Sequence, residues 1–127
     1  MPTILVVDDD ADLRHMLLMT IEDAGYRAAG AADGREALGL VREQPPDLIV
    51  CDILMPVLDG NSLAAELHGN PRWADIPIIG MSAHREDLHA ASAHFAMFLR
   101  KPFSVQHLIE TIIDLAGPGR DREAARA

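Results

Sequence analysis

Carboxylate side chains follow two apolar runs of this chain, at the point where each run ends. The run at residues 4–7 leads into Asp8 and Asp9, and the run at residues 48–51 leads into Asp52. Such runs are typical of buried strands, and ligands of open α/β sheets bind at the carboxyl ends of the strands. Crowded carboxylates repel one another, so the group must take up a proton or hold a cation. An all-oxygen site suits Mg²⁺ and a phosphoryl group better than it suits zinc.

The composition limits the classes of protein to which the chain can belong. A length of 127 residues predicts one domain with its own core. The net charge of −9 argues against a nucleic-acid surface, because phosphate contacts need Lys and Arg side chains. No apolar stretch of the sequence is long enough to span a membrane, so we expect no membrane partner, and we also expect no signal peptide. The single cysteine, Cys51, lies in an apolar run, so we expect a reducing cytoplasm and no disulfide framework.

Short apolar runs alternate with helical patterns along the whole chain. We predict strands at residues 3–7, 26–30, 47–51, 76–81 and 96–99, and helices at residues 13–24, 33–43, 61–68, 85–93 and 104–116. The third helix has Asn61 or Ser62 as its expected N-cap. The second strand contains Ala28, Ala29 and Gly30, whose small size places it at a sheet edge. This order predicts an α/β fold of (βα)₅ type, with a doubly wound, five-stranded parallel sheet covered by helices on both faces.

Three further motifs come at the ends of the later strands. Residues 52–60 read DILMPVLDG, residues 80–83 read GMSA, and residues 99–103 read LRKPF. Together with Asp8 and Asp9 they resemble the receiver domain of two-component response regulators, over residues 3–117. The resemblance implies the flavodoxin-like receiver fold with strand order 2-1-3-4-5. It also implies a receiver domain at residues 1–117, followed at residues 118–127 by a charged tail or the start of a linker.

The resemblance assigns a role to each residue of the acidic site. Asp52 matches the phosphoacceptor, whose carboxylate attacks the phosphorus of a phosphohistidine. Asp8 and Asp9 match the acid pair that holds Mg²⁺, or Mn²⁺ in its place, together with Asp52 and the backbone carbonyl of Leu54. The bland alternative for residues 8–10 is a helix N-cap, and it is most credible for Asp10.

The resemblance also assigns residues that respond to the phosphoryl group. Lys101 would offset its charge, and the bond from Lys101 to Pro102 matches a peptide that is commonly cis in the family. Ser82 would donate to a phosphoryl oxygen, and Phe98, three residues before the lysine, would turn into the space that Ser82 leaves. The alternatives are purely structural roles: Ser82 would be a turn residue, and Phe98 would be a core residue. Three residues would flank the phosphoryl site: Leu54, Ala83 and His84.

The region between Ser82 and Lys101 departs from the family pattern. It is shorter than usual, and His94 and Phe95 replace the usual small residues before the fifth strand. The partner surface of the family therefore does not carry over directly to this chain. The histidines are scattered without metal-ligand spacing, so the sequence does not predict a zinc site.

We predict that the chain is a signalling domain that accepts a phosphoryl group. It would not be an enzyme, apart from catalysing its own phosphotransfer and autodephosphorylation. Its partners would be a sensor histidine kinase or phosphotransfer protein and a downstream effector, and the domain would be a monomer or weak dimer. One alternative is a haloacid-dehalogenase-like phosphatase with Asp8 as nucleophile and Asp10 as acid/base. The other is a pseudo-receiver that binds a partner without being phosphorylated.

Overall fold

A parallel five-stranded sheet forms the centre of the molecule in the computed structural model, which describes residues 2–55, 57–84 and 94–119. The strand order is β2-β1-β3-β4-β5 and every neighbouring pair is parallel, as predicted. The strands are β1 (Thr3–Val7), β2 (Arg27–Ala31), β3 (Leu48–Asp52), β4 (Ile78–Ser82) and β5 (Met97–Arg100). The helices of the described residues are α1 (Ala11–Asp23), α2 (Gly34–Glu43), α3 (Gly60–His68) and α5 (Val105–Ala116). The helix predicted at residues 85–93 lies outside the described residues.

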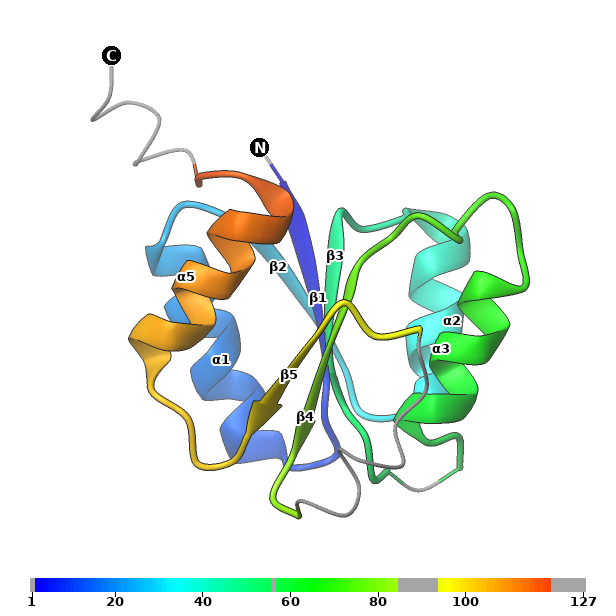
Figure 1. Ribbon diagram of the computed structural model, residues 1–127, viewed down its shortest axis with the longest axis horizontal. Coiled ribbons are helices and arrows are strands. Elements are labelled where there is room, and N and C mark those ends of the chain that lie inside the picture. The colour runs from blue at the N-terminus through cyan, green and yellow to red at the C-terminus, as the bar shows by residue number, and fades with distance from the viewer. Residues whose placement is uncertain (1, 56, 85–93, 120–127) are drawn as a thin grey trace.

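Helices cover both faces of the sheet (Figure 1). On one face α2 and α3 bury Ala37, Leu38, Leu63 and Leu67 against alternate strand residues. On the other face α1 and α5 bury their own apolar side chains in a second core, namely Leu17, Ile21, Leu108, Ile109 and Ile112. The two cores cover the central strands from both sides, which explains why residues 48–51 read as a continuous apolar run. Of the helices in this part of the chain, none is long and apolar enough to cross a membrane.

Four of the strands are shifted from their predicted bounds by one or two residues. β3 includes Asp52, β4 includes Ser82, and β5 continues to Arg100. The apolar runs stop before these residues, but the backbone hydrogen bonds continue, because Ile53 N donates to Met81 O and Lys101 N donates to Ser82 O. The polar residues of the predicted site are therefore held by the sheet itself.

The start of α3 differs from the prediction. Its N-cap is Asp59, whose carboxylate accepts a hydrogen bond from Ser62 N at 2.8 Å, so neither Asn61 nor Ser62 is the cap. Asp, Asn and Ser all cap helices well, and the choice falls on Asp59 because Gly60 approaches the end of β3 closely. Gly60 N donates to Ile53 O at 2.8 Å, and a Cβ on Gly60 would lie 2.6 Å from Asp52 O.

Candidate functional site

Two carboxylates and one ammonium group meet at the carboxyl edge of the sheet. β1 and β3 pair with Val7 opposite Cys51, so the next residues, Asp8 and Asp52, are neighbours. Both are buried, with 0% of Asp8 and 9% of Asp52 exposed. Lys101 follows β5 and reaches back across the edge, donating from Nζ to Asp8 Oδ2 at 3.0 Å and to Asp52 Oδ2 at 3.3 Å. The structure thus brings together three of the residues that the sequence predicted.

The charges of this group act on one another. Burial raises the pKa of Asp52 and the charge of Asp8 raises it further, while the ammonium group of Lys101 acts against both. Burial lowers the pKa of Lys101, but its hydrogen bond to Asp8 and the charges of the two carboxylates outweigh this, so the pKa lies above its ordinary value. Lys101 therefore stays protonated, and its ammonium group faces two buried carboxylates. The group as a whole favours a further cation.

Asp9 supplies the third carboxylate. One oxygen from each of Asp8, Asp9 and Asp52 can be chosen so that all three lie within 4.8 Å of one another. Asp9 is exposed, so the cluster faces solvent on one side. Three carboxylate oxygens with open positions are the donors that Mg²⁺ takes in phosphoryl-transfer sites, and the residues present fit that ion. The side chain of Leu54 is 53% exposed, and its amide N donates to Asp52 Oδ1 at 3.4 Å.

Two neighbours of Asp8 fix its position. Asp10 N donates to Asp8 Oδ1 at 2.9 Å, and Arg14 Nη1 donates to the backbone O of Asp8 at 2.7 Å. The carboxylate of Asp10 itself caps α1 by accepting from Asp12 N and Leu13 N, so the helix-cap interpretation is confirmed for Asp10. Arg14 was not among the residues predicted from the sequence. Its signal was a basic residue on the first turns of the helix that follows the acidic pair.

Ser82 ends β4 beside Lys101 and is 2% exposed. Its Oγ accepts a hydrogen bond from His84 N at 3.1 Å, so the hydroxyl takes part in the turn that follows the strand. Ser82 therefore acts as a turn residue in this structure, as the alternative interpretation predicted, and it lies beside the acidic group. Ala83 and His84 follow Ser82 and are exposed.

Phe98 lies in β5 opposite Gly80 of β4. It is half-buried, and its ring lies 5.3 Å from the ring of Phe95 at an angle of 42°. A Cβ on Gly80 would lie 2.9 Å from Phe95 Cδ1 and 3.1 Å from Phe98 Cδ1. The absence of a side chain at Gly80 thus makes room for this aromatic pair on the sheet.

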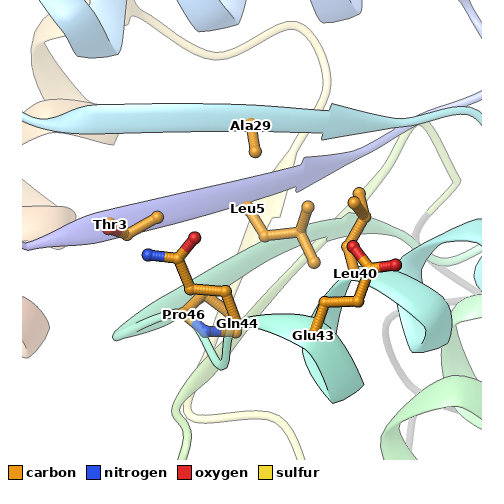
Figure 2. Close-up of a pocket in the computed structure, with 7 residues that line it drawn as sticks. All are labelled: Thr3, Leu5, Ala29, Leu40, Glu43, Gln44 and Pro46. Atoms are coloured by element: carbon orange, nitrogen blue, oxygen red, sulfur yellow. The ribbon is translucent and has the colours of Figure 1, made fainter.

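Two hollows lie near the sheet edges. One, with a volume of about 340 Å³, is bordered by Lys101 and the cis Pro102 of the acidic edge together with Leu13 and Met16 of α1. The other, about 180 Å³, lies at the amino end of the strands, where the single methyl group of Ala29 leaves space beside Leu5 (Figure 2). The first is lined by Lys101 and Ala83, whereas the second contains none of the predicted site residues.

The sequence matches the response regulator receiver domain family over residues 4–113. This chain belongs to that family. The receiver domain is 34% identical to the phosphate regulon transcriptional regulatory protein PhoB of Pseudomonas aeruginosa, over 96% of this chain and 56% of PhoB. It is 37% identical to an uncharacterized 14.6 kDa protein of Leptolyngbya boryana, over 86% of each chain.

Solved structures show the same fold. The chemotaxis protein CheY4 of Vibrio cholerae matches the receiver domain with a TM-score of 0.84 and 31% identity, over 91% of this chain and 98% of that one. The chain spans about half the length of PhoB and of the DNA-binding dual master transcriptional regulator RpaA of Synechocystis, at 56% and 48%. The match therefore identifies a receiver domain of two-component response regulators.

Proposed function

We propose that this receiver domain accepts a phosphoryl group on Asp52 from the phosphohistidine of a sensor histidine kinase or phosphotransfer protein. The observation that carries the proposal is the position of Lys101 Nζ, within 3.3 Å of carboxylate oxygens from both Asp8 and Asp52. A cation held at that point lies where the charge of an incoming phosphoryl group would develop. Phosphoryl transfer depends mainly on positioning and on charge stabilisation, which this group supplies.

In the proposed reaction an Asp52 oxygen attacks the phosphorus as the P–N bond to the donor imidazole breaks. The bonding pair leaves with the imidazole nitrogen, and Asp52 becomes an acyl phosphate. Lys101 offsets the negative charge that Asp52 gains, and Arg14 and Asp10 N hold Asp8 in place. Asp8, Asp9, Asp52 and the backbone carbonyl of Leu54 would hold Mg²⁺, or Mn²⁺, which when bound neutralises charge on the phosphoryl oxygens. The domain acts as a phosphoacceptor and is an enzyme only toward its own phosphorylation and dephosphorylation.

The response to phosphorylation would begin at Ser82. A phosphoaspartate adds about 1.5 to 2 negative charges. The Ser82 hydroxyl would exchange its bond with His84 N for one to a phosphoryl oxygen, and Phe98 would turn toward the space vacated. Leu54, Ala83 and His84 would border the phosphoryl group and control the approach of water.

The output would pass to a downstream effector. PhoB and RpaA are named as transcriptional or DNA-binding regulators, whereas this chain carries a net charge of −9. We therefore propose that any effect on DNA passes through a partner or another domain, with residues 1–117 as the receiver and 118–127 as its tail or linker. We also propose that the protein is cytoplasmic and is a monomer or a weak dimer.

The test is incubation with Mg²⁺ and acetyl phosphate, followed by intact-mass measurement. We expect one phosphoryl adduct on the wild type, none on Asp52→Asn, and a strongly reduced amount on Asp8→Asn. The matched control is Asp10→Asn, which should keep the adduct because its carboxylate only caps α1.

Three results would contradict the assignment. An adduct that persists in Asp52→Asn would exclude Asp52 as the acceptor. Loss of reactivity in both Asp8→Asn and Asp10→Asn, with Asp52→Asn unaffected, would favour the phosphatase. No adduct with acetyl phosphate or in kinase-driven transfer would favour the pseudo-receiver.

A further inference from the structure

Two histidines that are distant in sequence meet at the end of α3. His68 is the last residue of α3, and His94 belongs to the segment that leads into β5. Their Nδ1 atoms lie 2.8 Å apart, and their ring centroids are 4.6 Å apart at 80°. Because 26 residues separate them in sequence, their spacing gave no sign of a pair. The phosphorylation chemistry proposed above uses neither residue.

The backbone at both histidines is fixed by the core. Leu67, next to His68, is fully buried, and Phe95, next to His94, is 8% exposed. Ala96 N donates to Ile78 O at 2.8 Å, which ties the His94 segment to β4. The two imidazoles therefore face each other on backbone that is held by buried neighbours. Such preorganisation favours any ligand that needs both rings at once.

The charges around the pair suit a cation. Burial lowers the pKa of His68 and the nearby His94 lowers it further, while Asp75 acts in the opposite direction. The lowered pKa favours the neutral ring, which is the form in which an imidazole nitrogen can bind a metal ion. The carboxylate of Asp75 is close enough to act on the charge of His68 and would offset that of a bound cation.

We propose that His68 and His94 bind a divalent transition-metal ion of the Ni²⁺ or Cu²⁺ class through their Nδ1 atoms. Imidazole nitrogens suit these ions, and tetragonal coordination places neighbouring ligands at right angles. Two nitrogens each about 2.0 Å from one ion and at right angles to each other lie about 2.8 Å apart. Binding breaks the hydrogen bond between the rings, and the proton on one Nδ1 passes through solvent to the Nε2 of the same ring. Water fills the remaining positions of the ion.

This site is separate from the carboxylate group. α3 begins at Gly60, against the backbone of Asp52, and ends at His68. Its nine residues correspond to a length of about 13 Å, so the two sites lie at opposite ends of the helix. An ion on the histidines would link α3 to the segment that enters β5, and this holds whether or not Asp52 accepts a phosphoryl group.

The test is calorimetric titration of the full chain with Ni²⁺ in excess Mg²⁺, which competes with Ni²⁺ for the carboxylates. We expect one Ni²⁺ per chain, and an affinity at least about tenfold lower in His68→Ala and in His94→Ala. The matched control is His107→Ala, because His107 is exposed on α5. The Ni²⁺ affinity of this variant should match that of the wild type. Circular dichroism checks that each variant folds, with His68→Gln and His94→Gln as replacements for an alanine variant that does not.

A second measurement locates the ion directly. Substoichiometric Cu²⁺ should broaden the imidazole proton signals of His68 and His94 before that of His107. Absence of Ni²⁺ binding by the wild type would overturn the proposal, and so would unchanged affinity in both folded variants. Binding that is lost only in Asp52→Asn would place the ion at the carboxylates and would also overturn it.

Discussion

Two helical glycines with opposite surroundings provide a matched pair of substitutions. A Cβ on Gly60 would lie 2.6 Å from Asp52 O and 2.8 Å from Ile53 Cα, separations that real Cβ atoms essentially never show. Both neighbours are backbone atoms and cannot rotate away. Gly39 is exposed within α2, and a Cβ there would meet nothing within 4 Å. The same change to alanine should therefore have opposite effects at the two positions.

The magnitudes follow from these contacts. Gly39→Ala should raise the free energy of unfolding by about 0.5–1 kcal/mol, the usual difference between the two residues inside a helix. Gly60→Ala adds an atom to a packed site, which typically costs about 1–3 kcal/mol. Since the Cβ of Gly60→Ala meets backbone and the residue begins its helix, we expect a net loss of about 2 kcal/mol. For a domain of this size each kcal/mol corresponds to a change of about 3–5 °C in Tm.

Urea unfolding followed by the fluorescence of Trp73, the single tryptophan, measures both changes. Trp73 is buried, so its emission should report the loss of the core. Mg²⁺ affinity gives a second result, because a displaced Gly60 moves the backbone of Asp52, and only Gly60→Ala should weaken it. Equal shifts of the urea midpoint in the same direction for the two variants would refute the reasoning.

Three further predictions concern single side chains. Asp52→Asn should raise the Tm of the metal-free protein at pH 7, because the raised pKa of Asp52 means that its ionised form opposes folding. Calorimetry should show this gain in Tm shrinking as the pH falls toward 3.8, the ordinary pKa of an aspartate. A lower Tm of Asp52→Asn at pH 7 would contradict the prediction. Because the pKa of His68 lies below its ordinary value of 6.5 in the folded protein, the unfolded chain takes up a proton first as the pH falls below 6.5, and the free energy of unfolding decreases. Urea titrations between pH 7 and 5.5 should therefore show a larger loss of stability for the wild type than for His68→Gln. Parallel losses in the two proteins would count against this prediction. Tyr26→Phe removes the hydrogen bond from Tyr26 Oη to Gly117 O at 2.5 Å and should cost about 1 kcal/mol by urea unfolding, whereas an unchanged midpoint would show that the bond contributes nothing.

The sequence was sufficient to predict the strands and the acidic site. β1, β3 and β4 are almost fully buried, so their apolar runs were clear, and the weak β2 lies at a sheet edge as its small residues indicated. Asp8 and Asp52 could be placed together because parallel strands end at one edge of a sheet, and Lys101 was placed beside them from the family motif. The cis bond between Lys101 and Pro102 was also predicted correctly, from the family motif.

The remaining features depend on tertiary packing. Asp59 caps α3 in place of Asn61 or Ser62 because the next residue approaches the end of β3, and no local pattern records that approach. Arg14 reaches the carbonyl of Asp8 from a helix whose rotation is set by the core. The pairing of His68 with His94 requires the end of α3 and the start of β5 to be neighbours, which spacing along the chain does not encode.

The two cores on either side of the sheet also determine how accurately the carboxylates are spaced. Along β3, Leu48 and Val50 point into one core while Ile49 and Cys51 point into the other. A slip of one residue would exchange these two sets and would move Asp52 along its strand by about 3.3 Å. Insertion of a single residue within β3 should therefore remove cation binding and core packing together. The same hydrophobic contacts that stabilise the domain thus fix the distances between the carboxylates of its acidic site.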